Sequence, residues 1–209
     1  RSRGLGDVYK RQILGVSLAA AKTAALQARV PLYTYLGGVS SYILPVPMMN
    51  IINGGAHADN LLDIQEFMVV PSGASCFSDA LRWGAEIFQS LRSRLRDSGH
   101  STAVGDEGGF APDLSSNENA LEVIVESISD TGLKPGVDVL LSVDVDANEF
   151  LEANIYSMRG EGKNFNSDEL IGYLQRLTEQ FPISSIEDPL GEDDWDGWQE
   201  ITKRLGHKI

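Results

Sequence analysis

Residues 137–145 read Val137-Asp-Val-Leu-Leu-Ser-Val-Asp-Val145, and this apolar, β-branched run decides the fold more clearly than any other stretch. Such a run predicts a buried strand. Residues 167–181 follow as an expected helix, and residues 183–186 form a second short apolar run. A strand, a helix and a second strand in this order predict parallel neighbours in an α/β sheet.

The chain before this unit predicts two more strands and two helices. Residues 46–52 and 66–70 are apolar runs closed by Gly or Pro turns, as expected of buried strands. A helix follows, whose predicted apolar face contains Leu81, Ala85, Phe88, Leu91 and Leu95. The next helix is expected to begin at a capping box of Ser115 and Glu118, with Ala120, Leu121, Ile124 and Ile128 on its inner face. A last helix is expected over residues 194–205.

The beginning of the chain differs from the rest. Residues 1–12 are basic and carry no apolar periodicity, so we treat them as a foreign, non-native segment. Residues 13–27 are rich in alanine and predict a helix that stops before Pro31, followed by a turn at residues 37–38.

Composition excludes several classes of function. The 209 residues include 17 Lys and Arg against 30 Asp and Glu, a formal charge of −13, which argues against nucleic acid or anionic lipid as the main partner. A single cysteine, Cys76, excludes an internal disulfide framework and indicates a reducing compartment such as the cytoplasm. No apolar run reaches the ~18 residues of a membrane span, and no signal-peptide pattern is present.

Polar residues lie at the ends of the predicted strands or in glycine turns, as expected where strands of a barrel end at an active site. These candidates are His57, Gln65, Glu66, Asp106, Glu107, Asp144, Glu187 and Asp188. Carboxylates from several strand ends converge on one mouth of a barrel, and hard oxygen ligands of this kind suit Mg²⁺.

Each candidate also has an ordinary structural interpretation. His57 after two glycines reads as a turn residue, and Glu107 between glycines reads as an exposed loop charge. Asp144 could simply end its strand, and nearby Asp146 and Glu149 leave the choice of a metal ligand open. Glu187 begins an acidic run, which is usually a solvated face.

Taken together and in order, the motifs resemble the enolase family from residue 13 to residue 209. They are Leu14-Gly-Val-Ser-Leu-Ala19, Pro45-Val-Pro47, Asn53-Gly-Gly-Ala-His57, Gln65-Glu-Phe-Met68, Gly105-Asp-Glu-Gly-Gly-Phe-Ala-Pro112, and Ser185-Ile-Glu-Asp-Pro189 with Glu192-Asp-Asp-Trp195. Any one of these motifs is weak evidence, whereas six in order are specific.

The resemblance implies the fold, the reaction and the site. The fold would be α/β: an enolase-type TIM-like barrel, truncated, preceded by the end of an α+β N-terminal domain. The reaction would be the dehydration of 2-phosphoglycerate to phosphoenolpyruvate with two Mg²⁺ ions. Glu107 matches the general acid, assisted by Glu66, and His57, Gln65 and Glu66 match substrate contacts. Asp144 and Glu187 match two of three carboxylates that bind the tighter Mg²⁺.

The same resemblance implies what residues 1–209 lack. The third metal carboxylate and the lysine base would come from later segments, so we expect the isolated chain to be inactive. Asp146 stands where the family would have a small residue. The expected division is a non-family segment at 1–12, the end of the N-terminal domain at 13–42 and the first half of the barrel at 43–209.

Two competing interpretations remain. Another member of the superfamily would act on a different carboxylic acid, but such relatives carry a Lys-x-Lys pair that this chain lacks. A non-catalytic binding or structural half-protein is the other. The family also implies a homodimer or octamer in the cytoplasm, with cell-surface or secreted forms as a further implication.

Overall fold

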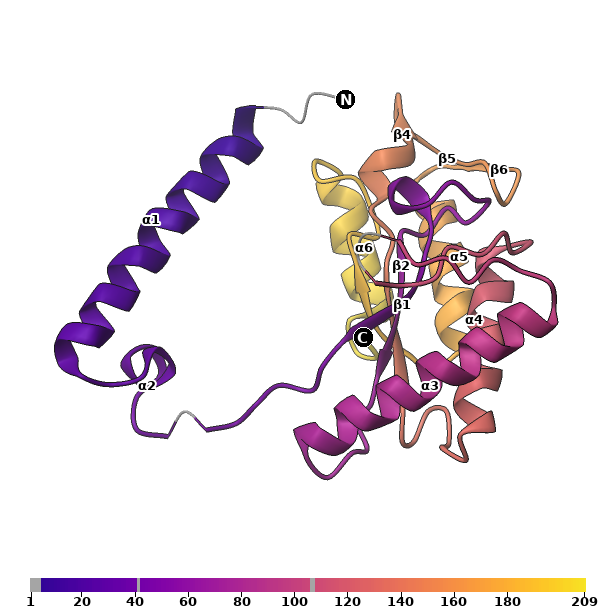
Figure 1. Cartoon of the computed structure of the whole chain (residues 1–209). Coiled ribbons are helices and arrows are strands. Elements are labelled where there is room, and N and C mark those ends of the chain that lie inside the picture. Colours follow the sequence, from indigo (N-terminus) through magenta and orange to yellow (C-terminus); the bar gives the residue numbers. More distant parts are fainter. Residues whose placement is uncertain (1–4, 41, 106–107) are drawn as a thin grey trace. The chain divides into compact units, whose positions relative to one another are not determined.

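The computed structural model describes residues 5–40, 42–105 and 108–209, with side chains from residue 12 onward. Two compact units divide the chain, Arg1–Leu44 and Pro45–Ile209 (Figure 1). In the described part of the chain, no helix combines the length and the apolar character needed to cross a membrane.

The first unit consists of two helices, α1 (Leu5–Ala28) and α2 (Leu32–Gly37). Helix α1 ends as predicted before Pro31, where Arg29 takes the left-handed conformation with φ 58°. Gly38 follows α2 with φ 78°, so the predicted glycine turn is confirmed. However, α1 begins eight residues before the predicted start at residue 13, because the helix continues into the basic segment.

The second unit contains a four-stranded sheet in the order β1-β2-β3-β7. These strands are β1 (Met49–Asn53), β2 (Glu66–Val70), β3 (Leu140–Asp144) and β7 (Ile183–Glu187). β1, β2 and β3 pair antiparallel, whereas β3 and β7 pair parallel, which confirms the parallel arrangement predicted for the later strands. The described residues form no closed barrel, as expected of part of one.

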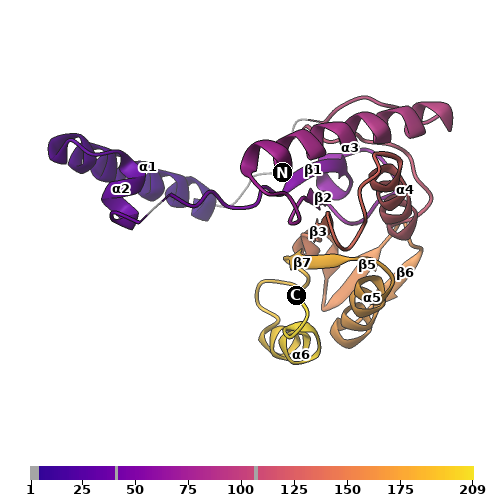
Figure 2. The ribbon, with the colours of Figure 1, turned by 90° about the horizontal axis from the view of Figure 1, so that it is seen from below.

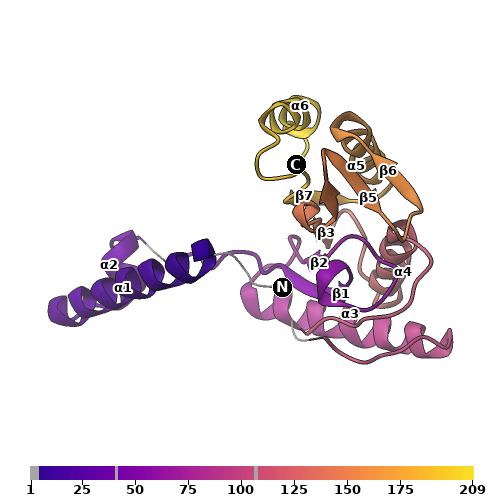
Figure 3. The ribbon, with the colours of Figure 1, turned by 90° about the horizontal axis from the view of Figure 1, so that it is seen from above.

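Four helices surround one face of this sheet (Figures 2 and 3). They are α3 (Phe77–Asp97), α4 (Asn117–Asp130), α5 (Ser167–Gln180) and α6 (Trp195–Leu205). The core between helices and strands is apolar and continuous, with Phe67, Ile87, Leu121, Val143 and Leu174 among its fully buried side chains. This core holds in place the sheet at whose strand ends the candidate site residues lie.

Two details of the helices correct the predictions. In α3 the buried face contains Ala80, Gly84, Ile87, Leu91 and Leu95, so the predicted Leu81 and Ala85 are exposed. Gly84 is buried because the Met49 side chain fills the space where a Cβ would lie. In α4 the cap is Ser116, whose hydroxyl accepts from the backbone N–H of Asn119, and not the predicted Ser115.

A second, three-stranded sheet was not predicted. It consists of β4 (Leu151–Glu152), β5 (Ile155–Met158) and β6 (Lys163–Phe165), all antiparallel. Ala153 and Asn154 have φ of 49° and 66°, as a tight two-residue hairpin turn requires. Strands of two to four residues are too short for the alternation that signals a strand.

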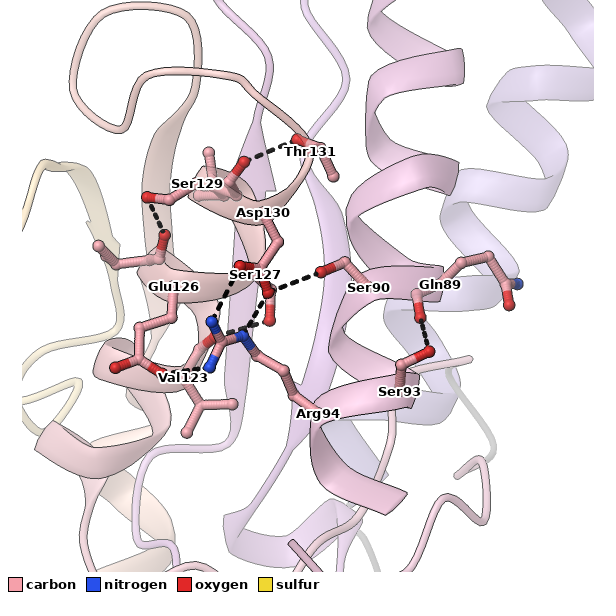
Figure 4. A network of polar contacts seen from close by, with 12 residues as sticks. Gln89, Ser90, Ser93, Arg94, Val123, Glu126, Ser127, Ser129, Asp130 and Thr131 are labelled. Atoms are coloured by element: carbon pink, nitrogen blue, oxygen red, sulfur yellow. Dashed lines mark hydrogen bonds and ion pairs between the residues drawn. The ribbon is translucent and has the colours of Figure 1, made fainter. Parts of the chain in front are cut away.

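Charged side chains join α3 to α4 on the surface (Figure 4). Arg94 donates two hydrogen bonds to Asp130, with Nε–Oδ2 at 2.6 Å and Nη2–Oδ1 at 3.0 Å. Its Nη1 donates to Glu126 at 2.7 Å. The bidentate bond from Arg94 lowers the pKa of the Asp130 carboxyl.

Replacing Arg94 by alanine is expected to lower stability modestly at pH 7. A carboxyl whose pKa is lower in the folded state contributes stability above its unfolded pKa of about 3.9, and this contribution is lost as the pH falls through the folded value. The difference in urea midpoint between wild type and Arg94→Ala should therefore shrink from pH 7 to pH 3. An equal difference at both pH values would contradict this account. The exposed Arg92→Ala on the same helix is the control.

Candidate active site

One edge of the four-stranded sheet carries a polar side chain from each strand. In β1 and β2, Asn53 pairs with Glu66. Glu66 in turn pairs with Asp144 of β3, and Asp144 pairs with Glu187 of β7. Neighbouring strands lie about 4.8 Å apart, so each member of this polar row is adjacent to the next. Three carboxylates predicted to serve the site thus come from separate strands to one edge.

Strand direction explains why these residues meet. β1, β3 and β7 end at this edge, whereas the antiparallel β2 begins there. The pairing continues just outside the strands, because Gln65 N–H donates to the Asp144 carbonyl and Val145 N–H to the Glu187 carbonyl, both at 3.0 Å. The backbone that carries the row is therefore fixed on both sides.

His57 lies beside the row. It ends a short 3₁₀ turn, η1 (Gly55–His57), and its Nδ1 is 3.5 Å from Glu66 Oε1. The loop folds back because Gly54 N–H donates to the Gln65 carbonyl at 2.9 Å. Gly54 also packs against the Ile64 carbonyl, where a Cβ would lie only 2.4 Å from the oxygen. The two glycines before His57 are needed for this close return.

Asp144 of the row has a strongly perturbed carboxyl. Burial, followed by repulsion from Glu187, raises the pKa of Asp144 to about 6, although the Asp146 N–H donates to Asp144 Oδ1 at 3.1 Å. The neighbouring Glu187 is exposed. Two adjacent carboxylates that repel each other at neutral pH form a place where a cation is favoured.

Asp146 connects this pair to Gln65. Burial raises the pKa of Asp146, and a hydrogen bond from the buried Gln65 side chain lowers it in part. Asp146 has φ 44°, the left-handed conformation that Asp tolerates better than most residues. It stands outside the polar row, as does Glu149, so the row includes Asp144 alone from that acidic patch. Which of them binds a metal stays a prediction.

Glu107 and Asp106 lie outside the described residues, but the residues around them are placed. Gly105 N–H donates to the Gly109 carbonyl at 2.9 Å, and Asn53 Nδ2 donates to the same carbonyl at 2.9 Å. Asn53 N–H donates to the Phe110 carbonyl at 2.8 Å. The fully buried Asn53 of the polar row therefore holds the Gly109–Phe110 end of this glycine loop near the edge, and the Gly105 N–H bond to Gly109 joins the other end to it.

Asn53 is the site residue that sequence reasoning missed. Its signal is present, since an amide directly before Gly54-Gly55 ends an otherwise apolar strand. A buried amide at such a place needs partners, and Asn50 Nδ2 and the Gly109 carbonyl supply them.

The donor set fits Mg²⁺ in part. Among residues 5–40, 42–105 and 108–209, no group of three or more His, Cys, Asp or Glu side chains could hold a metal ion. Asp144 and Glu187 nevertheless present two carboxylates side by side, and Mg²⁺ commonly takes only one or two protein carboxylates together with water and substrate oxygens.

The fold and the site together define a class of protein. Barrel-type strands with outer helices and carboxylates at the strand ends are the construction of α/β-barrel enzymes. Residues 41–209 match the family model described as enolase, C-terminal TIM barrel domain. That match covers well over half of the chain, and the chain belongs to this family.

Proposed function

We propose that the protein containing this chain dehydrates 2-phosphoglycerate to phosphoenolpyruvate, the phosphopyruvate hydratase step of glycolysis. The observation that carries the proposal is the polar row, in which Glu66 lies between Asn53 and Asp144, and Asp144 lies beside Glu187. Three carboxylates of the row, Glu66, Asp144 and Glu187, share one edge, and this supports the roles proposed for them below. Membership of the enolase C-terminal barrel family supports the same reaction.

The first chemical difficulty is the removal of a weakly acidic proton beside a carboxylate that is already charged. Bound Mg²⁺ supplies electrostatic stabilisation to the negative charge that develops. We propose Asp144 and Glu187 as two of its ligands. Repulsion between them contributes to the raised pKa of Asp144, and a cation would relieve that repulsion.

The second difficulty is the loss of hydroxide, which needs a proton donor. We propose Glu107 as this donor, with Glu66 assisting at the leaving hydroxyl. Glu66 suits the role because its side chain is only 14% exposed and lies 3.5 Å from His57 Nδ1. His57 would contact the substrate from the loop before β2, and Gln65 would do so from the position directly before this strand.

The family is expected to use a lysine as the base, and we assign this role to no residue within 13–209. We therefore expect the 209-residue polypeptide by itself not to turn over the substrate. From the resemblance we also propose that the enzyme is oligomeric and cytoplasmic. Residues 13–42 would form the end of its N-terminal domain. The proposed boundary at residue 12 falls within α1, which runs unbroken from Leu5 to Ala28.

Hydrogen exchange at the substrate carbon tests the reaction class. The protein made from its complete reading frame would be incubated with Mg²⁺ in D₂O, with 2-phosphoglycerate or with 2-hydroxy acids that lack phosphate. We expect that only 2-phosphoglycerate loses its C2 hydrogen and forms the enol phosphate. Proton NMR would monitor both changes. Exchange in an unphosphorylated acid would indicate another superfamily reaction, and exchange in none would favour a non-catalytic protein.

A further inference from the structure

The segment just before Gln65 and Glu66 is held by one buried side chain from a distant helix. Asn117, the first residue of α4, is 1% exposed. Its Oδ1 accepts from the backbone N–H groups of Asp63 at 3.1 Å and Ile64 at 3.2 Å. One amide oxygen therefore fixes two consecutive peptide groups immediately before the site residues.

A second connection fixes the same segment from the other side. The Asp63 carboxylate accepts from the Gly160 and Glu161 N–H groups, each at 3.0 Å, in the turn between β5 and β6. The contact is close, because a Cβ on Gly160 would overlap the Leu61 carbonyl oxygen. The three-stranded sheet, which was not predicted, thus helps to hold the segment before Gln65 and Glu66.

Glu161 closes the connections into a ring. Its Oε1 accepts from the Asn117 N–H at 3.0 Å and from the Tyr173 hydroxyl at 3.2 Å. Asn117 Nδ2 donates to the Tyr173 hydroxyl at 3.3 Å. Glu161 and Tyr173 therefore orient Asn117, and its Oδ1 is held toward the N–H groups of residues 63–64.

We propose that Asn117 is a positioning residue for Gln65 and Glu66. It reaches them through the backbone: Ile64 leads directly to Gln65, whose N–H donates to Asp144 and whose side chain donates to Asp146. The next residue, Glu66, lies opposite Asp144 in the polar row. What the two positioned groups do in catalysis rests on the proposed function, whereas their placement by Asn117 does not.

Steady-state kinetics separate positioning from simple folding. Replacing Asn117 by alanine is expected to lower kcat about tenfold and to raise KM for 2-phosphoglycerate, because small displacements of reacting groups are costly. A loss of folded protein would lower the apparent kcat and leave KM unchanged. Tyr173→Phe removes one hydroxyl that orients Asn117 but leaves both Asn117 Oδ1 bonds in place, so its rise in KM should be smaller than that of Asn117→Ala.

Asn119→Ala is the matched control, since Asn119 lies in the same helix and its side chain bonds only within residues 115–122 among the contacts described. Kinetic constants of Asn117→Ala equal to those of Asn119→Ala, after correction for folded fraction, would overturn the proposal.

Amide hydrogen exchange provides a readout that does not depend on activity. We expect Asn117→Ala to increase exchange of the Ile64, Gln65 and Glu66 amides relative to the β7 amides, with no such change in Asn119→Ala. If the wild-type protein lacked turnover, the proposed function would fail while this measurement still decided the role of Asn117. Unchanged exchange over residues 64–66 would show that Asn117 does not hold the segment.

Discussion

Replacing Glu107 by glutamine in the complete protein is expected to lower phosphoenolpyruvate formation by about 10²- to 10⁴-fold. The amide has the shape of the carboxylic acid but cannot give a proton to the leaving hydroxyl. Mg²⁺ affinity should change little, because the proposed ligands are Asp144 and Glu187. Turnover can be followed by the absorbance of the enol phosphate, and Mg²⁺ affinity by calorimetry.

The position of Glu107 in the reaction allows a second readout. An acid that acts after proton removal is not needed for exchange of the C2 hydrogen, so Glu107→Gln should still exchange this hydrogen with D₂O. Glu118→Gln removes an exposed carboxylate at the start of α4 and should leave the rate near that of wild type. Unchanged turnover in Glu107→Gln would refute the assignment.

Replacing Asp144 by asparagine is expected to change metal affinity and stability in opposite directions. Mg²⁺ should bind about tenfold more weakly or worse, a loss of roughly 1.4 kcal/mol or more, because one anionic ligand is removed. The metal-free protein should gain about 1 kcal/mol at pH 8, after allowance for solvent screening, because burial and Glu187 disfavour the ionised Asp144. The asparagine oxygen can still accept from the Asp146 N–H.

The sign of the stability change follows from the raised pKa. A carboxyl that protonates more readily in the folded protein stabilises it below the unfolded pKa, and this stabilisation is lost as the pH rises through the folded value near 6. Urea unfolding without metal at pH 8 and calorimetry with Mg²⁺ measure the two effects. Glu192→Gln removes an exposed carboxylate outside the polar row and is the control. A variant that binds Mg²⁺ as tightly as wild type would remove Asp144 from the ligand set.

Much of the sheet could be predicted because its strands are buried and apolar. The predicted strand at residues 66–70 matches β2, and that at residues 183–186 lacks only Glu187 of β7. The face of α3 was partly wrong because burial there depends on Met49, which comes from β1 and occupies the space above Gly84. Such packing between distant segments leaves no periodic signal in the helix itself.

The sequence predicted that carboxylates from several strand ends converge, but not which of them are direct neighbours. Order along the chain indicated that Glu66, Asp144 and Glu187 belong to one site, whereas the pairing that makes them neighbours depends on strand register. Asn117 was not among the residues that the sequence singled out. Its role depends on contacts with Asp63 and Glu161, which lie 54 and 44 positions away along the chain. Sequence spacing gives no sign of contacts over such distances.

The measurement that tests the central claim most directly is the rate of phosphoenolpyruvate formation from 2-phosphoglycerate, with and without Mg²⁺. The protein should be made from its complete reading frame and shown to be folded by circular dichroism. We predict turnover at a rate ordinary for enzymes, about 1–10³ s⁻¹, which is abolished by a chelator and restored by Mg²⁺. A folded protein that forms no phosphoenolpyruvate at any Mg²⁺ concentration would contradict the account.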